Sequence, residues 1–409
     1  MQNPMRKAHI LLPAEHVAYD KWAVVACDQF TSQPDYWRSV EEIVGDAPST
    51  LRLTLPEIWL GQAEARVPQI HAAMERYLRD GVLKEAVDGF VLVERTTASG
   101  VRPGLVAALD LEAYDFAAGS RTPIRATEGT VPSRVPPRAA IRRGAALELP
   151  HVMMLVDDKV NALVEPLWAK RDSFRKLYDV DLMMDGGHLA GWAVEGEDAD
   201  SALRACDRLM EACDGLLFAV GDGNHSLAAA RQCWLERRET LTEEQRRDDP
   251  ARFALVEIVN LNCPAMQFEP IHRVLFNVDS LEFYRELRMA MRAHAFEDRP
   301  GSDLKLIEKS TELSFAFHEH PLPFLQGFLD QYLVRHPETS IDYIHGEEAV
   351  RALVGENPRS MGFLLRPFDK AELFGSIRRW GALPRKTFSM GEATEKRYYM
   401  EARSIRRDS

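Results

Sequence analysis

Residues 216–234, LLFAVGDGNHSLAAARQCW, join a short apolar run to a helical pattern through a polar loop. The apolar run predicts a buried strand, and the pattern after the loop predicts a helix. The loop itself, 221–226, is GDGNHS. Backbone N–H groups at a helix start have no helical acceptor, and together with the helix dipole they attract anions. The stretch therefore predicts a strand, an anion-binding loop and a helix.

Each residue of this loop suits a role in binding or chemistry. Gly221 and Gly223 let the backbone approach a ligand closely. Asp222 fits a proton acceptor or a metal ligand. His225 can donate to a phosphoryl oxygen or move a proton near neutral pH, and Ser226 is a natural helix cap. By composition alone, a structural turn with a capped helix is the simpler interpretation.

Two known phosphate-binding patterns are not complete here. The P-loop pattern GxxxxGK[ST] is absent from the chain, and Ser226 stands at the third glycine position of GxGxxG. The nucleophile elbow GxSxG and the zinc motif HExxH are also absent, which argues against a serine hydrolase and a catalytic zinc site. Cys27 ends an apolar run, and no sequence neighbour would obviously activate it.

Length and composition indicate a large soluble protein. The chain has 409 residues, of which 45% are hydrophobic, and this predicts two or three domains. The formal charge of −12, from 51 basic and 63 acidic residues, argues against a nucleic-acid partner. Five cysteines without a CxxC pattern, no membrane-length apolar run and no signal peptide predict a cytoplasmic protein with no membrane partner. The oligomeric state is not fixed by the sequence.

Strands and helices alternate along the chain, which predicts an α/β to α+β fold with mixed sheets and additional strand–helix units near the C-terminus. We expect three regions. Residues 1–150 form an N-terminal α/β region with an arginine-rich loop. Residues 151–276 carry the GDGNHS loop, and residues 277–409 form a βαβα region with a basic loop.

Three basic stretches stand out in this acidic chain. Residues 119–143 hold six arginines and one carboxylate, Glu128. Arg134 can clamp a phosphate, and Glu128 can act as a general base or metal ligand. The other basic candidates are His272, Arg273, Arg366 and Lys386. Each stretch also fits an ordinary solvated or structural segment, but the three together favour an anionic ligand.

Several stretches, in this order, resemble one bacterial family. They include WAVVACDQFTSQPDYW (22–37), RATEGTVPSRVPPRAAIR (125–142), VGDGNHSLAAA (220–230), EPIHRVLF (269–276) and LPRKTFSMGEATEKRYY (383–399). Together they resemble the family catalogued as domain of unknown function ten-fifteen, over about residues 7–405. The family is grouped with the ParB/sulfiredoxin-like superfamily, so the resemblance implies a ParB/sulfiredoxin-like core.

The hallmark of that superfamily is a loop of the type DGHHR. Residues 222–226 match it, with Asn224 in place of the first histidine and Ser226 in place of the arginine. The family pattern HExT corresponds to residues 127–130, which include Glu128 and Thr130. A PTHR-like element corresponds to residues 270–273, and a PPKSTYF-like element to residues 384–388. With the loop arginine missing, Arg134 or Arg273 is expected to replace it.

Superfamily members include free-serine kinases, nucleotide-hydrolysing DNA-partition proteins and sulfinic-acid reductases. The last need a cysteine in the loop, and residues 221–226 have none. A DNA-partition role fits poorly with the net charge and with the lack of a helix-turn-helix pattern. The resemblance therefore implies phosphoryl transfer at the loop. We expect a phosphotransferase that makes O-phosphoserine from free L-serine, with pyrophosphate favoured over a nucleotide as donor and Mg²⁺ as cofactor.

The expected roles follow from this chemistry. The loop amides and His225 hold the transferred phosphoryl group. Either Glu128 or Asp222 takes the hydroxyl proton, while the other helps to hold Mg²⁺. The expected partners are a small-molecule donor and an amino-acid acceptor. The alternatives are a non-enzymatic protein that binds a nucleotide or phosphometabolite, and a nucleotide or pyrophosphate hydrolase. The full set of candidates is Asp222, His225 and Glu128 for catalysis, Asp222 for the metal, and Gly221, Gly223, Asn224, Ser226, Thr130, Arg134, His272, Arg273, Arg366 and Lys386 for binding.

Overall fold

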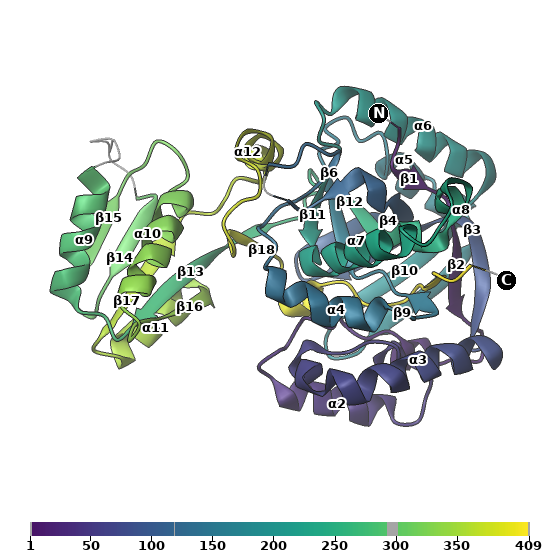
Figure 1. The fold of residues 1–409 in the computed structure, drawn as a ribbon, viewed down its shortest axis with the longest axis horizontal. Helices are drawn as coiled ribbons and strands as arrows, with labels where there is room; N and C mark the ends of the chain where they lie inside the picture. Colours follow the sequence, from purple (N-terminus) through teal and green to yellow (C-terminus); the bar gives the residue numbers. More distant parts are fainter. Residues whose placement is uncertain (1, 118, 293–301, 408–409) are drawn as a thin grey trace. The chain divides into compact units, whose positions relative to one another are not determined.

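The computed structural model describes residues 2–117, 119–292 and 302–407, which form two compact units (Figure 1). The first unit comprises Met1–Gln267, Ile377–Ala382 and Gly391–Ser409, and the second comprises Phe268–Ser376 and Leu383–Met390. This division differs from the three predicted regions. Strands from 1–150 and 151–276 pair in one sheet, and the end of the chain returns to the first unit, so sequence order does not separate the units.

The first unit is built on an eleven-stranded mixed sheet, counted over the described residues. Its main path runs β5-β6-β11-β8-β12-β4-β3-β10-β9, with β1 paired to β4 and β2 to β3. Strand β11 is parallel to β6 and antiparallel to β8, and β8 is parallel to β12. The strands are β1 Met5–Arg6, β2 Ala8–Pro13, β3 Leu83–Thr97, β4 Gly100–Asp110, β5 Tyr114–Asp115, β6 Ile124–Ala126, β8 Val152–Val156, β9 Lys176–Leu182, β10 Gly187–Val194, β11 Phe218–Asp222 and β12 Phe253–Asn260. A separate two-stranded sheet pairs β7 (Leu147–Glu148) with β19 (Arg403–Ser404).

Both faces of this sheet are covered, because side chains alternate along a strand. In β3, Val91 and Val93 pack into one apolar cluster, whereas Phe90 and Leu92 pack into another. The first cluster includes residues of α1, α2 and α3, and the second includes residues of α5, α6 and α7 (Figure 1). The helices of this unit are α1 Tyr19–Trp22, α2 Pro34–Val44, α3 Ala63–Arg79, α4 Val135–Arg142, α5 Glu165–Ala169, α6 Gly196–Ala212, α7 Asn224–Arg238 and α8 Glu243–Asp248.

The second unit holds a six-stranded sheet with the path β15-β14-β17-β13-β16, and β18 pairs with β13. Its described pairings are antiparallel. Helices α9 and α10 pack in one apolar cluster and α11 in another. The elements are β13 Phe268–Phe276, α9 Ser280–Arg292, β14 Leu304–Ile307, β15 Glu312–Phe315, α10 Leu322–Arg335, β16 Ser340–His345, α11 Glu347–Glu356, β17 Ser360–Leu365, α12 Leu373–Trp380, which extends into the first unit, and β18 Phe388–Met390.

The predicted fold class is confirmed. The first unit has a mixed sheet with helices on both faces, and further strand–helix units, on an antiparallel sheet, follow toward the C-terminus. All five cysteines lack disulfide partners. None of the helices in the described ranges has the length and apolar character needed to cross a bilayer.

Candidate functional site

The predicted strand, loop and helix are present, and Gly223 makes the turn between them. β11 ends at Asp222, and α7 begins at Asn224. Gly223 is the N-cap, with a φ of 81° that disfavours other residues. A Cβ atom on Gly223 would also lie 2.9 Å from Cδ2 of His151 and 3.1 Å from Cα of Val152. A glycine is therefore required both by the backbone angle and by the close packing.

Ser226 is not the helix cap that the sequence suggested. The left-handed backbone of Gly223 starts the helix three residues earlier than a cap at Ser226 would, so Ser226 lies in the first turn. It lines a cavity of about 150 Å³ beside the helix start. The polar part of that lining includes Cys27, Asp28, Arg138 and His151. The loop therefore opens onto a small cavity rather than onto bulk solvent alone.

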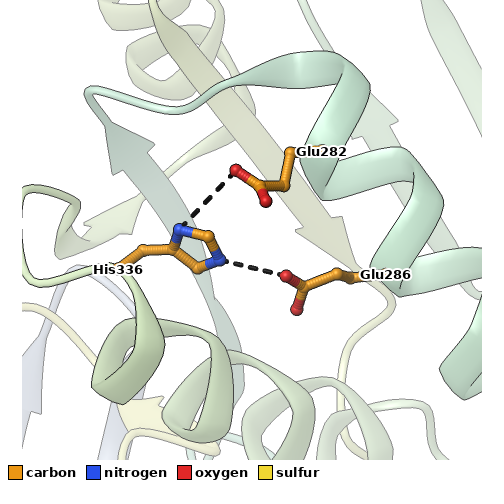
Figure 2. A group of neighbouring side chains, drawn as sticks. All are labelled: Glu282, Glu286 and His336. Carbon is orange, nitrogen blue, oxygen red and sulfur yellow. Dashed lines mark hydrogen bonds and ion pairs between the residues drawn. The ribbon is translucent and has the colours of Figure 1, made fainter.

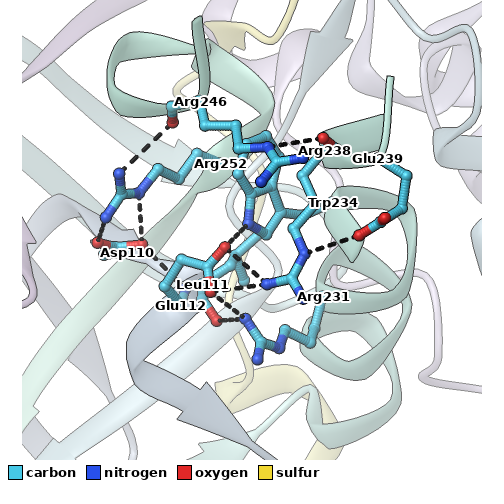
Figure 3. A network of polar contacts seen from close by, with 9 residues as sticks. All are labelled: Asp110, Leu111, Glu112, Arg231, Trp234, Arg238, Glu239, Arg246 and Arg252. Carbon is cyan, nitrogen blue, oxygen red and sulfur yellow. Dashed lines mark hydrogen bonds and ion pairs between the residues drawn. The ribbon is translucent and has the colours of Figure 1, made fainter. Parts of the chain in front are cut away.

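The middle of α7 is fixed by a polar network (Figure 3). Glu112 accepts hydrogen bonds from Nε1 of Trp234 at 2.6 Å and from Nη1 of Arg238 at 3.0 Å. Arg231 donates to the carbonyl of Leu111 at 2.6 Å and lies 3.4 Å from the Glu112 carboxylate. Burial would raise the pKa of Glu112, but these partners outweigh it and lower that pKa. The network holds the helix, and with it the helix N-terminus, at one position on the sheet.

A partly buried ion pair lies next to the turn. Oδ2 of Asp28 is 3.4 Å from Nε2 of His151, whose side chain is 10% exposed. Burial would raise the pKa of Asp28, but the charge and hydrogen bond of His151 hold it well below its usual range. Burial would lower the pKa of His151, but its neighbours Tyr399, Asp28 and Cys27 raise it well above the usual value. The pair is therefore a carboxylate and an imidazolium at neutral pH.

His225 is neutral, in contrast to His151. Burial, together with the charges of Arg138 and Arg134, lowers its pKa to about 4. Nε2 of His225 accepts a hydrogen bond from the backbone N–H of Val131 at 3.1 Å. The proton of the neutral ring is then on Nδ1, which is a donor.

Asp222 is the last residue of β11, and its carboxylate has two partners. Its Oδ1 accepts from the N–H of Gly223 at 2.9 Å, and its Oδ2 is 3.7 Å from Nζ of Lys396. Lys396 also contributes to the low pKa of Asp28, after burial and the contributions of His151 and Gln29. Lys396, from the C-terminal segment, therefore acts on both acidic side chains of the site, Asp222 and Asp28.

The segment that carries Glu128 lies beside the loop. β6 and β11 run parallel, with Ala126 opposite Val220; Asp222 is the last residue of β11, and Glu128 comes two residues after the end of β6. The hydroxyl of Thr127 donates to the carbonyl of Val220 at 2.6 Å and lies 3.5 Å from Nδ2 of Asn224. Arg134 is exposed and acts on His225 through its charge. Gly221 lies within β11, and the Thr130 side chain is beside Tyr114.

The other four candidates lie in the second unit. Nδ1 of His272 accepts from the N–H of Leu365 at 3.2 Å. The guanidinium of Arg273 is buried and donates to the carbonyls of Arg385 and Lys386 at 3.1 Å and 2.8 Å, so it supports that loop. Arg366 lies 3.4 Å from Asp303, and Lys386 is exposed with a φ of 57°.

One group of metal-ligating side chains occurs among the described residues, and it is in the second unit (Figure 2). His336 lies between Glu286, at 3.0 Å, and Glu282, at 3.9 Å. Arg335 also binds Glu286, at 2.5 Å. These contacts describe an ion-pair cluster, in which the acidic groups already have cationic partners. Asp222, the predicted magnesium ligand, fits a different arrangement, in which one or two protein carboxylates and substrate phosphates share the ion.

Sequence comparison identifies the family. The model of the family described as "Protein of unknown function (DUF1015)" matches residues 11–357. The chain belongs to this family. No curated protein matches the sequence of this DUF1015 protein.

Solved structures give distant matches. Free serine kinase in complex with AMP has a TM-score of 0.41 and 10% identity, covering 72% of this chain and 90% of that one. SbnI with a C-terminal truncation, from Staphylococcus aureus, has a TM-score of 0.38 and 7% identity, covering 70% and 82%. A conserved hypothetical protein from Pyrococcus furiosus has a TM-score of 0.37 and 9% identity, covering 72% and 90%. At these scores the likeness does not bear on function.

Four residues of the site were not among the sequence candidates: Asp28, His151, Lys396 and Tyr399. Asp28 carried a weak signal, because polar residues end its apolar run. His151 follows a proline and precedes a strand, and Lys396 and Tyr399 lie in a basic stretch near the C-terminus. No local pattern links these three segments.

Proposed function

We propose that this DUF1015 protein is a small-molecule phosphotransferase that phosphorylates free L-serine, with pyrophosphate or a nucleotide as donor. The observation that carries the proposal is the start of α7. Gly223 sets the helix N-terminus against His151, and a neutral histidine and two arginines lie close by. A phosphoryl group needs donors and positive charge at fixed positions, and this arrangement offers both.

The binding of the phosphoryl group rests on several donors. The first-turn N–H groups of α7 have no acceptor within the helix, and the helix dipole favours negative charge there. Nδ1–H of His225 adds a donor, because Nε2 already accepts from Val131. Arg134 supplies positive charge, as does Arg138, which pairs with Glu57 at 3.0 Å. The N–H and guanidinium groups thus hold the donor oxygens, while His225 stays uncharged.

The proton of the acceptor hydroxyl needs a base near the transferred group. Asp222 and Glu128 follow neighbouring parallel strand ends, so both carboxylates are at the same edge of the sheet. One accepts the hydroxyl proton, and the other helps to hold Mg²⁺. Bound Mg²⁺ would neutralise charge on the donor oxygens. Lys396 keeps the Asp222 carboxylate in place through their 3.7 Å contact.

Phosphorus NMR tests this proposal directly. The purified protein is incubated with Mg²⁺ and L-serine, and pyrophosphate, ADP, ATP and CTP are supplied in turn. We expect a serine-dependent phosphomonoester signal with one of the donors. Donor loss without any acceptor would instead identify a hydrolase, and no turnover with any donor would contradict the proposal.

A matched pair of variants locates the activity. Asp222→Asn removes the charge of the proposed base or metal ligand, and we expect a loss of about 100-fold or more in rate. Asp214→Asn makes the same chemical change at a side chain that is 91% exposed, and we expect unchanged activity. Equal rates in the two variants would remove Asp222 from the mechanism.

A non-enzymatic binding protein is the second candidate. Asn224 and Ser226 are uncharged and do not titrate, so the loop can bind an anion without acid–base chemistry. In that case, calorimetry detects binding of pyrophosphate or a nucleotide, while the NMR experiment detects no product.

A further inference from the structure

The cavity beside α7 contains a cysteine that phosphoryl transfer does not use. Cys27 is half-buried and lines the cavity of about 150 Å³. Its sulfur is 3.7 Å from Nδ1 of His151 and 3.2 Å from the hydroxyl of Tyr399. By contrast, the sulfurs of Cys213 and Cys233 are close to the carbonyls of Met210 and Ala139, at 3.1 Å and 3.5 Å.

The hydroxyl of Tyr399 links the sulfur to the imidazole. It lies 2.6 Å from Nδ1 of His151 and accepts from the backbone N–H of Cys27 at 3.1 Å, while its own O–H is directed at the sulfur. Asp28 contacts the other imidazole nitrogen at 3.4 Å and so orients the ring. The order of groups is a thiol, an imidazole and a carboxylate, with a hydroxyl donor aimed at the sulfur. The thiolate is the nucleophilic form of a cysteine, and a neighbouring imidazole is a suitable carrier for its proton.

The same cavity has room and donors for a small electrophile. Much of its lining is apolar and includes Leu53, Leu55 and Met74, which suits a short acyl chain. Ser226, in the first turn of α7, lines the cavity too. Attack on a carbonyl carbon places negative charge on its oxygen, and donors at a helix N-terminus stabilise such an oxyanion.

We propose that Cys27 is a nucleophilic thiol that accepts a small acyl group from an activated ester or thioester, with His151 and Asp28 as its proton carrier and orienting carboxylate. A bond forms between the sulfur and the carbonyl carbon, and the bond from that carbon to the leaving group breaks. The sulfur attacks as the thiolate, with its proton held on the His151 imidazolium. The leaving group departs with the bonding electron pair and takes that proton from His151. The inference goes beyond the proposed phosphotransferase and does not depend on it.

The probe is p-nitrophenyl acetate, added to the full chain and followed by peptide mass spectrometry of all five cysteines. We expect S-acetylation of Cys27 well before that of Cys213, which is an internal control because it is also half-buried. His151→Gln should slow acetylation of Cys27 by about 100-fold and leave Cys213 unchanged. Equal rates at the two cysteines in the wild-type chain would overturn the proposal.

A pH readout separates chemical activation from a structural role. The titratable groups next to the sulfur are His151 and Tyr399, and Asp28 contacts His151. The other charged groups that line the same cavity are Glu57, Arg138, Arg142 and Glu148. At about pH 10 an ordinary thiol is ionised without help, so the His151→Gln variant should regain most of its rate at Cys27. A variant that stays equally slow at both pH values would mean that His151 only supports the local structure, and the proposal would fail. Tyr399→Phe removes the hydroxyl, which is both the donor to the sulfur and the acceptor from the Cys27 N–H, and is expected to show a smaller loss with the same recovery.

Discussion

Arg397 donates a hydrogen bond from Nε to the carbonyl oxygen of Pro150, at 2.8 Å. Pro150 directly precedes His151, and Arg397 lies between Lys396 and Tyr399 in the C-terminal segment. Arg397 also forms ion pairs with Glu257 and with Glu401, which are 2% and 0% exposed. This one guanidinium therefore fixes the segment that supplies Lys396 and Tyr399 against the segment that supplies His151.

Replacing Arg397 by methionine should strongly destabilise the first unit. The change leaves Glu257 and Glu401 buried without their cation, and removal of one partner from such a pair costs about 3–5 kcal/mol. Urea unfolding measures the free energy of unfolding. Arg406→Met is the control, because Arg406 pairs with Glu75 where both side chains are nearly half exposed, and such pairs contribute about 1 kcal/mol or less. Similar losses of unfolding free energy in both variants would show that the buried ion pairs of Arg397 stabilise the protein no more than the exposed pair of Arg406.

Gly223→Ala should disturb the site through two effects. The positive φ makes alanine unfavourable by about 1–2 kcal/mol, and the added Cβ collides with His151 and Val152. Gly381→Ala is the comparison for the first effect, because Gly381 is in the same unit, has a φ of 83° and has open space around its Cβ position. We expect Gly223→Ala to lose clearly more unfolding free energy than Gly381→Ala. Equal losses in unfolding free energy would mean that His151 moves away from the added Cβ atom at no measurable cost.

The titration of His225 is a direct test of its environment. Its pKa of about 4 in the folded chain lies below the ordinary value of 6.5. Between these pH values the unfolded chain binds a proton that the folded chain does not. The contribution of His225 to stability is therefore complete above pH 6.5 and is lost as the pH falls toward 4. NMR of the imidazole signals should give this midpoint. Added pyrophosphate should raise it, because a bound anion favours the imidazolium.

Glu112→Gln should weaken the attachment of α7. The variant keeps a similar shape but loses the charge that faces Arg231 and Arg238. Because the pKa of Glu112 is lowered in the folded chain, its stabilising effect is present at neutral pH and disappears as the carboxylate is protonated on acidification. We expect a loss of about 1–3 kcal/mol in unfolding free energy at pH 7. The difference from the wild type should shrink at low pH, and a constant difference would point to packing instead.

The sequence located the centre of the site because that part is local. Strand β11, the glycine turn and helix α7 are contiguous, so hydrophobic pattern and turn chemistry were sufficient. The cap position was wrong, because the left-handed conformation of Gly223 is a property of its packing against His151. Asp28, His151 and Tyr399 meet from three distant segments, and no periodicity links them. The sequence also made Arg273 a binding candidate, because it is a basic residue beside an apolar run. In the structure its side chain is fully buried and donates to backbone carbonyls.

The return of the chain to the first unit after residue 390 has a consequence for biosynthesis. A ribosome makes Asp28, His151 and the GDGNHS loop first, then the second unit, and Lys396 and Tyr399 last. The nascent first unit thus lacks Arg397 and its ion pair with Glu257 until the residues after 390 have left the exit tunnel. An interrupted translation product would carry the loop and most of the sheet, but neither the lysine beside Asp222 nor the tyrosine beside Cys27.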